Sequence, residues 1–252
     1  MDLYFEMYSG ISGDMTIASL LDLGASKEKL IEGLKSIDFG KYELIFDRKI
    51  KNGIDSNYFE VIINENKDHH EDNIHDNHHF HRNLFEIEKI IDSGSFNEKV
   101  KGNAKKIFKI IAKAESKAHG IDISEVHFHE VGAIDSIIDI IGVSILMDDL
   151  NPDNVYFSDF YEAKGYINIA HGPMPLPTPA TLNIITDNDF NLNLIDDFGE
   201  RNTPTGAAIV ANYATGKLDF PFKVKRVGIG AGKNNFKKTN NILRVMEIEK
   251  KK

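Results

Sequence analysis

The residue types best suited to metal chemistry gather in one short segment, HFHEVGAIDSIID, which begins at His127. Alternate side chains of a strand share a face, so His127 and His129 are expected to point the same way. Asp135 and Asp139 are four residues apart on the helix expected to follow, and they therefore share one helix face. The glycine between the two pairs permits a turn that would bring them together. Two imidazoles and two carboxylates form a ligand set suited to nickel, zinc, manganese or iron.

The alternative is structural: two strand histidines that hydrogen-bond to backbone, and two aspartates that act as first-turn charges of a helix. The helix expected from Ile134 to Leu150 is strongly apolar. Charged side chains are costly to bury on such a helix unless they have partners. We therefore favour the metal site, and we predict His127, His129, Asp135 and Asp139 as its ligands.

A glycine-rich turn, SGISGDM, follows the first expected strand. Such a turn at the start of a helix presents several backbone N–H groups together and forms an anion-binding concavity. Asp14 within this turn could reach a metal ion. The spacing by itself favours a simpler role, in which Ser12 caps the helix and Asp14 complements its dipole. The groups predicted to bind an anion are those of Ser9, Gly10, Ser12 and Gly13.

Six of the ten histidines lie in the tract NENKDHHEDNIHDNHHFHRN. The tract has almost no apolar residues, so we predict a mobile insertion over residues 66–83. Flexible histidine-rich chains bind divalent ions in many geometries and select poorly among them, which fits metal capture better than catalysis. The alternative is a solvated insertion without a role. The metal-binding histidines predicted here are His69, His70, His75, His78, His79 and His81.

Two further segments could line a pocket. In HGPMPLPTPAT, prolines at alternate positions stiffen the chain, so His171 would lie beside a preorganised wall or a rigid connector. In TPTGAA, Thr205 and Gly206 are expected to start a helix and to offer a second anion-binding turn. The alternating glycines of GIGAG, at residues 228–232, permit close approach of a flat ligand or of another backbone.

Composition narrows the class of protein. The chain has 252 residues, of which 41% are hydrophobic, and this length can bury a sizeable core. Its net charge of -9 argues against nucleic-acid binding. The absence of cysteine excludes thiolate metal sites and cysteine nucleophiles. The N-terminus lacks a signal-peptide pattern and the longest apolar stretch carries four aspartates, so we expect a cytoplasmic protein without membrane partners.

Strands and helices alternate along the chain, which predicts an α/β fold. The expected strands Tyr42–Ile50 and Tyr58–Ile63 flank the turn Asn52-Gly53 as an antiparallel hairpin, so the sheet should be mixed and flanked by helices. Further strands are expected at Leu3–Met7, Val126–Glu130, Val155–Phe160, Tyr166–Ala170, Val224–Ile229 and Ile242–Ile248. Helices are expected at Leu84–Ile91, Asn97–His119 and Ile134–Leu150, and near Thr178 and Thr205.

The strings SGISGDM, HFHEVGAIDSIIDIIG, HGPMPLPTPAT, TPTGAA and GIGAGK with NILRV occur here in that order. Together they resemble the LarC family of nickel insertion proteins, and the resemblance runs from the N-terminus to about Arg244. It implies a nickel chelatase of the lyase class that places Ni²⁺ into pyridinium-3,5-bisthiocarboxylic acid mononucleotide. The product would be the nickel-pincer nucleotide cofactor of lactate racemase-type enzymes, and the reaction would use CTP with Mn²⁺ or Mg²⁺.

The resemblance also implies an organisation and a set of site residues. Family members continue into a C-terminal CTP-binding domain, so we expect residues 1–252 to form a single α/β domain whose CTP site lies on a separate chain or is missing. Metal binding or loss of a ring proton would then involve His127, His129, Glu130, Asp135 and Asp14. The nucleotide would contact Ser9, Gly10, Ser12, Gly13, His171, Thr205 and Gly206.

The residues alone leave two other functions open. The histidine-rich tract fits a nickel or zinc metallochaperone, or a storage protein without catalysis. Carboxylates and histidines near helix-start turns fit a metal-dependent phosphohydrolase.

Overall fold

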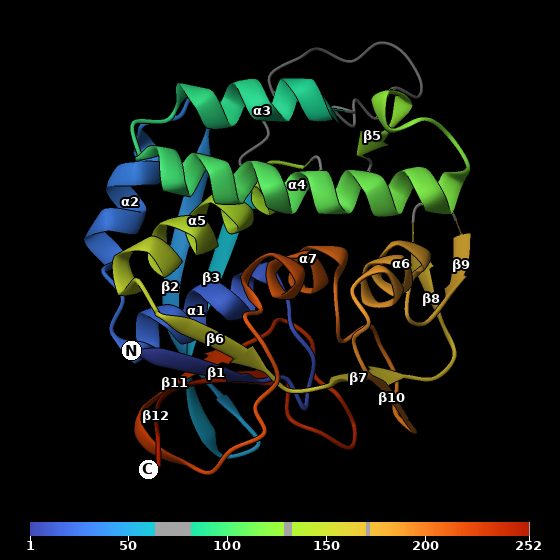
Figure 1. The fold of residues 1–252 in the computed structure, drawn as a ribbon. Coiled ribbons are helices and arrows are strands. Elements are labelled where there is room, and N and C mark those ends of the chain that lie inside the picture. The colour runs from blue at the N-terminus through green and yellow to red at the C-terminus, as the bar shows by residue number, and fades with distance from the viewer. Residues whose placement is uncertain (64–81, 129–132, 170–171, 252) are drawn as a thin grey trace, which may run out of the picture.

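The computed structural model describes residues 1–63, 82–128, 133–169 and 172–251, and it shows helices layered on a mixed six-stranded sheet (Figure 1). The sheet order is β2-β3-β11-β12-β1-β6, with both parallel and antiparallel neighbours. The predicted α/β class with a mixed sheet is therefore confirmed. None of the helices in the described ranges is long and apolar enough to cross a membrane.

The first strand, β1 (Asp2–Glu6), lies between β6 (Asn154–Phe157), to which it is parallel, and β12 (Ile242–Lys250), to which it is antiparallel. Its alternate residues Leu3 and Phe5 are fully buried beneath the helices, as the period of a strand requires. The other strands of this sheet are β2 (Tyr42–Lys51), β3 (Ile54–Ile63) and β11 (Phe222–Ala231).

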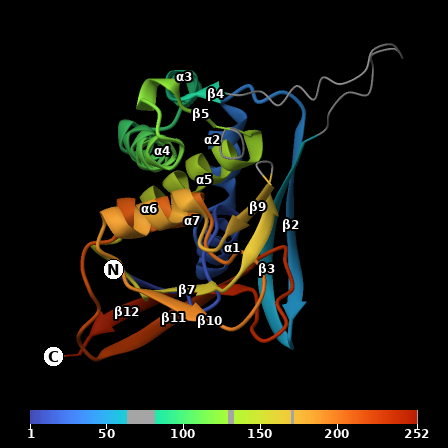
Figure 2. The same cartoon turned by 90° about the vertical axis from the view of Figure 1, so that its right-hand side faces the viewer.

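The predicted hairpin forms the outer edge of the sheet, where β2 and β3 pair over their full lengths (Figure 2). Asn52 and Gly53 connect the strands, and both have positive φ, at 48° and 83°. Two such residues match the twist of the flanking strands, which explains why an Asn-Gly pair occupies this turn.

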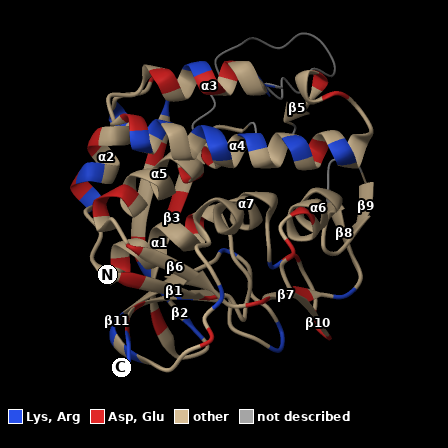
Figure 3. Cartoon of the chain, in the orientation of Figure 1, with Lys and Arg blue, Asp and Glu red and all other residues tan. Residues whose placement is uncertain are grey.

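The helices form two layers over one face of the sheet. Helix α1 packs directly on β3, β11 and β12, whereas α4 lies farther out, on α5, α6 and α7, and carries α3 (Figure 1). Charged residues of both signs are spread along the outer helices α3 and α4 (Figure 3). The helices are α1 (Gly13–Leu23), α2 (Lys27–Lys35), α3 (Leu84–Ser93), α4 (Glu98–His119), α5 (Ile134–Leu150), α6 (Pro179–Asp187) and α7 (Pro204–Tyr213).

Three small sheets complete the described structure. The short strands pair as β4 (Arg82–Asn83) with β5 (His127–Phe128), β7 (Phe160–Ala163) with β10 (Leu192–Ile195), and β8 (Tyr166–Ile169) with β9 (Gly172–Pro175). A single 3₁₀ turn, η1 (Ile123–Glu125), precedes β5.

Several predicted boundaries differ from the structure, and the strand expected at Tyr58–Ile63 begins four residues earlier, at Ile54. The strand expected at Val155–Phe160 is two strands, β6 and β7, because the chain leaves the main sheet at Ser158 and then pairs with β10. The strand expected at Val126–Glu130 is limited to His127–Phe128 within the described ranges. Most of the predicted insertion at 66–83 lies outside those ranges, but Arg82 and Asn83 form β4.

The alternating glycines of β11 allow helix α1 to lie against the sheet. A Cβ atom on Gly228 would lie 2.2 Å from the Ser19 carbonyl oxygen, and one on Gly230 would lie 2.2 Å from the Met15 carbonyl oxygen. Two alternatives were predicted for this motif, the close approach of a flat ligand or of another backbone. The structure shows the second, because the backbone of α1 lies against these glycines.

We predict that Gly230→Ala lowers the free energy of unfolding by about 1–3 kcal/mol, because the new methyl group overpacks the contact with α1. Gly102→Ala is the control, because a methyl group at that position of α4 would lie more than 4 Å from the surrounding atoms of the described residues. Alanine there should instead stabilise the protein by roughly 0.5–1 kcal/mol. Chemical denaturation measures both, and equal effects of the two substitutions would contradict this account of the motif.

Candidate functional site

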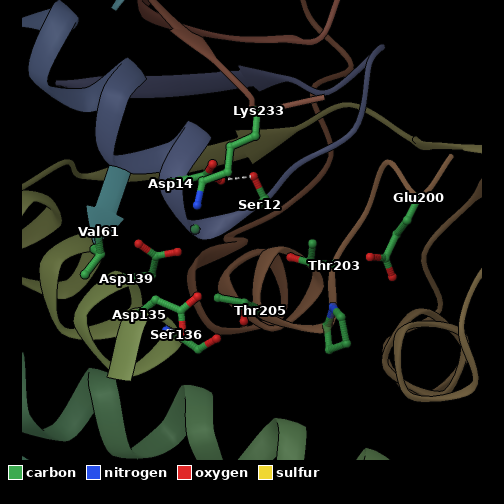
Figure 4. Close-up of a pocket in the computed structure, with 12 residues that line it drawn as sticks. Ser12, Asp14, Val61, Asp135, Ser136, Asp139, Glu200, Thr203, Thr205 and Lys233 are labelled. Atoms are coloured by element: carbon green, nitrogen blue, oxygen red, sulfur yellow. Dashed lines mark hydrogen bonds between the residues drawn. The ribbon is translucent and has the colours of Figure 1, made fainter. Parts of the chain in front are cut away.

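A pocket of about 210 Å³ lies where the N-terminal ends of α1, α5 and α7 meet (Figure 4). Three helix dipoles therefore direct their positive ends toward one space. The pocket is nevertheless rich in carboxylates, with one lysine among its lining side chains. It is lined by Ser12, Gly13, Asp14, Val61, Asp135, Ser136, Asp139, Glu200, Thr203, Pro204, Thr205 and Lys233.

The first turn of α1 supplies Asp14. Ser12 occupies the N-cap position, as predicted, but its hydroxyl donates to the Asp14 carboxylate and makes no capping bond to the helix backbone. Asp14 also accepts a hydrogen bond of 2.9 Å from the Met15 N–H. Gly13 is required here because a Cβ atom would lie 2.6 Å from the Asp139 side chain. The two carboxylates therefore approach each other across a position without a side chain.

A backbone bridge joins the glycine-rich turn to the segment before α7. The Ile11 N–H donates to the Arg201 carbonyl over 3.0 Å, and the Thr203 N–H donates to the Ile11 carbonyl over 3.2 Å. Gly10, with φ of 93°, lies so close to Arg201 that a Cβ atom would be 2.1 Å from its carbonyl oxygen. This bridge brings the starts of α1 and α7 together, although they are far apart in the sequence.

Helix α7 begins earlier than predicted. Thr203 is the N-cap and accepts a hydrogen bond of 3.1 Å from the Gly206 N–H, and Pro204 is the first helical residue. Proline suits that position because its missing N–H would have no partner there. Thr205 lies in the first turn and faces the pocket, whereas Gly206 packs against the Ile11 carbonyl and does not line it.

Two half-buried carboxylates of the site, Asp139 and Asp14, have raised pKa values. Burial, reinforced by the charges of Asp14 and Asp135, raises the pKa of Asp139 well above its usual value. Burial also raises the pKa of Asp14, although hydrogen bonds from Ser12 and Met15 oppose the shift. The like charges of Asp14 and Asp139 disfavour joint ionisation, so the pair is suited to hold a proton or to receive a cation.

Lys233 provides the positive charge of the pocket. Burial alone would lower its pKa, but the hydrogen bond to Glu60 and the charges of Glu60, Asp14 and Asp135 raise it, so the ammonium group stays protonated. Its Nζ lies 3.2 Å from a Glu60 carboxylate oxygen. The buried Lys51 holds the loop behind it, donating to the Asn234 carbonyl over 2.9 Å.

The chain matches the family described as nickel insertion protein over residues 3–252. It belongs to the nickel insertion protein family. It is 46% identical over 254 residues to the pyridinium-3,5-bisthiocarboxylic acid mononucleotide nickel insertion protein of Alkaliphilus metalliredigens, covering 98% of this chain and 60% of that protein. The corresponding protein of Acetivibrio thermocellus is 38% identical over 252 residues, covering 99% of this chain and 61% of its own length.

A further relative is the putative nickel insertion protein of Dictyoglomus thermophilum, 40% identical over 246 residues that cover 96% of this chain and 59% of that protein. The chain thus spans about 60% of the length of these curated relatives. No solved structure matches it.

The pocket collects part of the residue set predicted from the sequence. Asp14, Asp135, Asp139, Ser12, Gly13 and Thr205 line it. Ser9, Gly10 and Gly206 lie in the turns that support it without lining it. Apart from His127, the remaining predicted residues fall outside the described ranges: His129, Glu130, His171, His69, His70, His75, His78, His79 and His81.

His127 does not join the aspartates in the lining of this pocket. His127 is exposed on β5, where it pairs with Asn83 of β4, and it does not line the pocket. A two-residue strand takes its position from its partner, and β4 holds β5 outside the pocket lining. Within the described ranges, no group of three or more histidine or carboxylate side chains is arranged to hold a metal ion. Among the described residues, the pocket carboxylates therefore form no closed ligand set of their own.

Sequence reasoning missed Lys233, Glu200, Ser136 and Thr203 as pocket residues. Lys233 directly follows the GIGAG motif, and a lysine at the end of a glycine-rich strand is a signal that could have been used. Glu200 has no such local signal, since contacts with distant segments position it, among them the backbone bridge at the neighbouring Arg201 and a hydrogen bond from the Thr178 hydroxyl.

We predict that Asp139→Asn stabilises the protein at neutral pH. A carboxyl group with a raised folded-state pKa contributes stability that is complete below its unfolded value, about 3.9, and is lost as the pH rises through the folded value. Asparagine removes this loss, so the gain in melting temperature should be largest at neutral pH and should disappear below about pH 4. Thermal unfolding across pH, in the presence of a chelator, measures it.

Asp55→Asn is the control, because the pKa of Asp55 is shifted in the opposite direction to that of Asp139. A hydrogen bond from Arg48 lowers the pKa of Asp55, so its contribution is present above the unfolded pKa and is lost as the pH falls. If Asp139→Asn also destabilised the protein at neutral pH, burial would not be the dominant influence on Asp139.

Proposed function

We propose that this chain carries out the nickel-insertion step of its family, in which Ni²⁺ enters pyridinium-3,5-bisthiocarboxylic acid mononucleotide to give a nickel-pincer nucleotide. The family match over residues 3–252 carries this proposal. The names of the relatives supply the substrate class. Sulfur ligands for nickel would come from the substrate, so the absence of cysteine from the chain presents no obstacle.

The pocket carboxylates suit the proton chemistry of this reaction. Formation of a nickel–carbon bond requires that the pyridinium ring lose a proton. A carboxylate whose pKa is raised above its usual value accepts a proton more readily and is suited to act as a general base. Asp139 and Asp14 meet this condition, and Asp135 adds a third carboxylate on the same face of α5. We therefore assign proton acceptance to the Asp14–Asp139 pair and attraction of the incoming cation to all three.

Lys233 suits the anionic groups of the substrate. The thiocarboxylates and the phosphate would be repelled by an uncompensated acidic pocket. Lys233 holds a protonated ammonium group there, anchored by Glu60. We propose that it orients one anionic group while the three aspartates face the metal and the ring.

The co-reactants belong to the same proposal. We propose that the reaction uses CTP with Mn²⁺ or Mg²⁺, and that the CTP site belongs to the part of the relatives that this chain does not span. His129, Glu130, His171 and the histidine-rich tract stay predicted participants, with the tract acting in metal capture.

The test is an insertion assay with the purified chain, the remaining part of the Alkaliphilus metalliredigens relative, thiocarboxylated substrate, nickel and CTP, with product detected by mass spectrometry. Asp139→Asn should lower kcat by about 100-fold because it removes the base. Lys233→Met should raise KM by roughly 10-fold or more because a charge-assisted contact is lost.

Lys237→Met is the matched control, since Lys237 lies outside the pocket, over the exposed ring of Phe198. It should leave both constants unchanged. Absence of any nickel product from folded protein would refute the proposed function, and equal effects of the two lysine substitutions would refute the role of Lys233.

A metallochaperone without catalysis is the second candidate, and the six histidines between residues 69 and 81 favour it. Deletion of residues 66–81 separates the two. An insertion enzyme should keep its product yield at saturating nickel and lose it only when nickel is scarce, whereas a chaperone should lose nickel transfer at every concentration.

A further inference from the structure

Glu162 is a fully buried carboxylate outside the pocket, at 0% exposure on β7. It accepts four hydrogen bonds from N–H groups. Oε1 accepts from the backbone of Ala163 over 2.8 Å and of Arg201 over 3.0 Å. Oε2 accepts from the backbone and the side chain of Asn202, each over 3.0 Å. Both carboxylate oxygens are therefore occupied by donors, and three of the four belong to the segment that precedes α7.

The Arg201–Asn202 segment positions the starts of α1 and α7 at the pocket. Glu200 and Thr203, on either side of Arg201 and Asn202, both line the pocket. Arg201 and Thr203 also hold the backbone of Ile11, which places the start of α1. A displacement of Arg201 and Asn202 would therefore move pocket groups on α1 and on α7 together.

The side chains of this segment have other partners: the Asn202 amide donates to the Tyr161 carbonyl, and the Arg201 guanidinium group donates to the Thr239 hydroxyl, each over 2.7 Å. The backbone N–H groups of Arg201 and Asn202, in contrast, donate to Glu162. The Asn202 Oδ1 and the Arg201 Nε are buried, and neither has a hydrogen-bond partner among the described residues. Such atoms favour departure of the segment toward water. The guanidinium group of Arg201 pairs with Asp197 over 2.6 Å, which anchors the side chain but leaves the backbone N–H groups to Glu162.

We infer that Glu162 is a positioning residue of the nickel-insertion site, which holds the Arg201–Asn202 backbone so that the starts of α1 and α7 stay joined at the pocket. The consequence for catalysis rests on the proposed function, whereas the consequence for the backbone bridge does not. Glu162 touches neither the pocket nor a substrate placed in it, so it acts through Arg201 and Asn202.

Glu162→Gln tests the inference with little change in side-chain volume. The amide replaces one acceptor oxygen with a donor, so one of the two pairs of N–H groups faces another donor. Hydrogen exchange, followed residue by residue, should become about 10-fold faster or more at the Ile11 and Thr203 amides, with little change at the Val245 amide of β12. Glu162→Asp keeps the charge but is shorter, and it should give the same pattern if the glutamine variant does not fold.

Leu34→Ala is the matched control for general destabilisation, because Leu34 is fully buried on α2, which packs on α5 rather than on the bridge. At equal denaturation midpoints it should not single out Ile11 and Thr203. In the insertion assay, Glu162→Gln should lower kcat by at least 10-fold relative to Leu34→Ala.

The outcomes separate the two proposals. Selective exchange at Ile11 and Thr203 supports the positioning role, even if the wild-type chain makes no nickel product, in which case only the proposed function falls. Unchanged exchange at both amides, or the same pattern in Leu34→Ala, overturns the positioning role. Selective exchange with kcat equal to that of Leu34→Ala overturns its link to catalysis.

Discussion

The exchange of backbone hydrogen bonds between Ile11 and the Arg201–Thr203 segment is the constraint on which the site depends. It places the start of α1 beside the start of α7, and the first turn of α5 completes the same space. Close approach needs the absence of a side chain at Gly10, Gly13 and Gly206, each of which lies against backbone or carboxylate atoms. The glycines of these motifs thus permit close packing between segments of the chain.

The electrostatic interactions among the pocket carboxylates lower the stability of the folded protein. Burial and mutual repulsion raise the pKa values of Asp14 and Asp139, which means that the folded protein disfavours their ionised forms. The helix dipoles and Lys233 offset part of this penalty. Groups in such an environment exchange protons or accept cations readily, and perturbed carboxylates of this kind concentrate at functional sites. The same features that weaken the fold are those that the proposed insertion chemistry would use.

Family membership and pocket geometry contribute different parts of the functional argument. The match over residues 3–252 assigns the family, and the relatives' names supply the class of substrate. Neither identifies a residue. The assignment of Asp14, Asp135, Asp139 and Lys233 comes from their position around one space and from the sign of their charges (Figure 4).

The sequence by itself determined the features that arise from local spacing. It predicted the α/β class, the hairpin at Asn52-Gly53 and the helix from Ile134 to Leu150, because turn geometry and hydrophobic period act between neighbouring residues. It also placed Asp135 and Asp139 on one helix face, since residues four apart always share a face. Local capping propensity located Ser12 at the start of α1, although its hydroxyl bonds to Asp14 instead.

Only the tertiary structure decided which of these features meet. His127 was predicted beside the aspartates, but it lies on a two-residue strand, β5, that is positioned by pairing with Asn83 of β4. No local sequence pattern reveals the partner of so short a strand. Lys233, Glu200 and the supporting Glu162 were missed because their contacts join segments distant in the chain. Such contacts depend on the complementary shape and charge of whole elements once packed, and this information is spread over the chain rather than contained in any one motif.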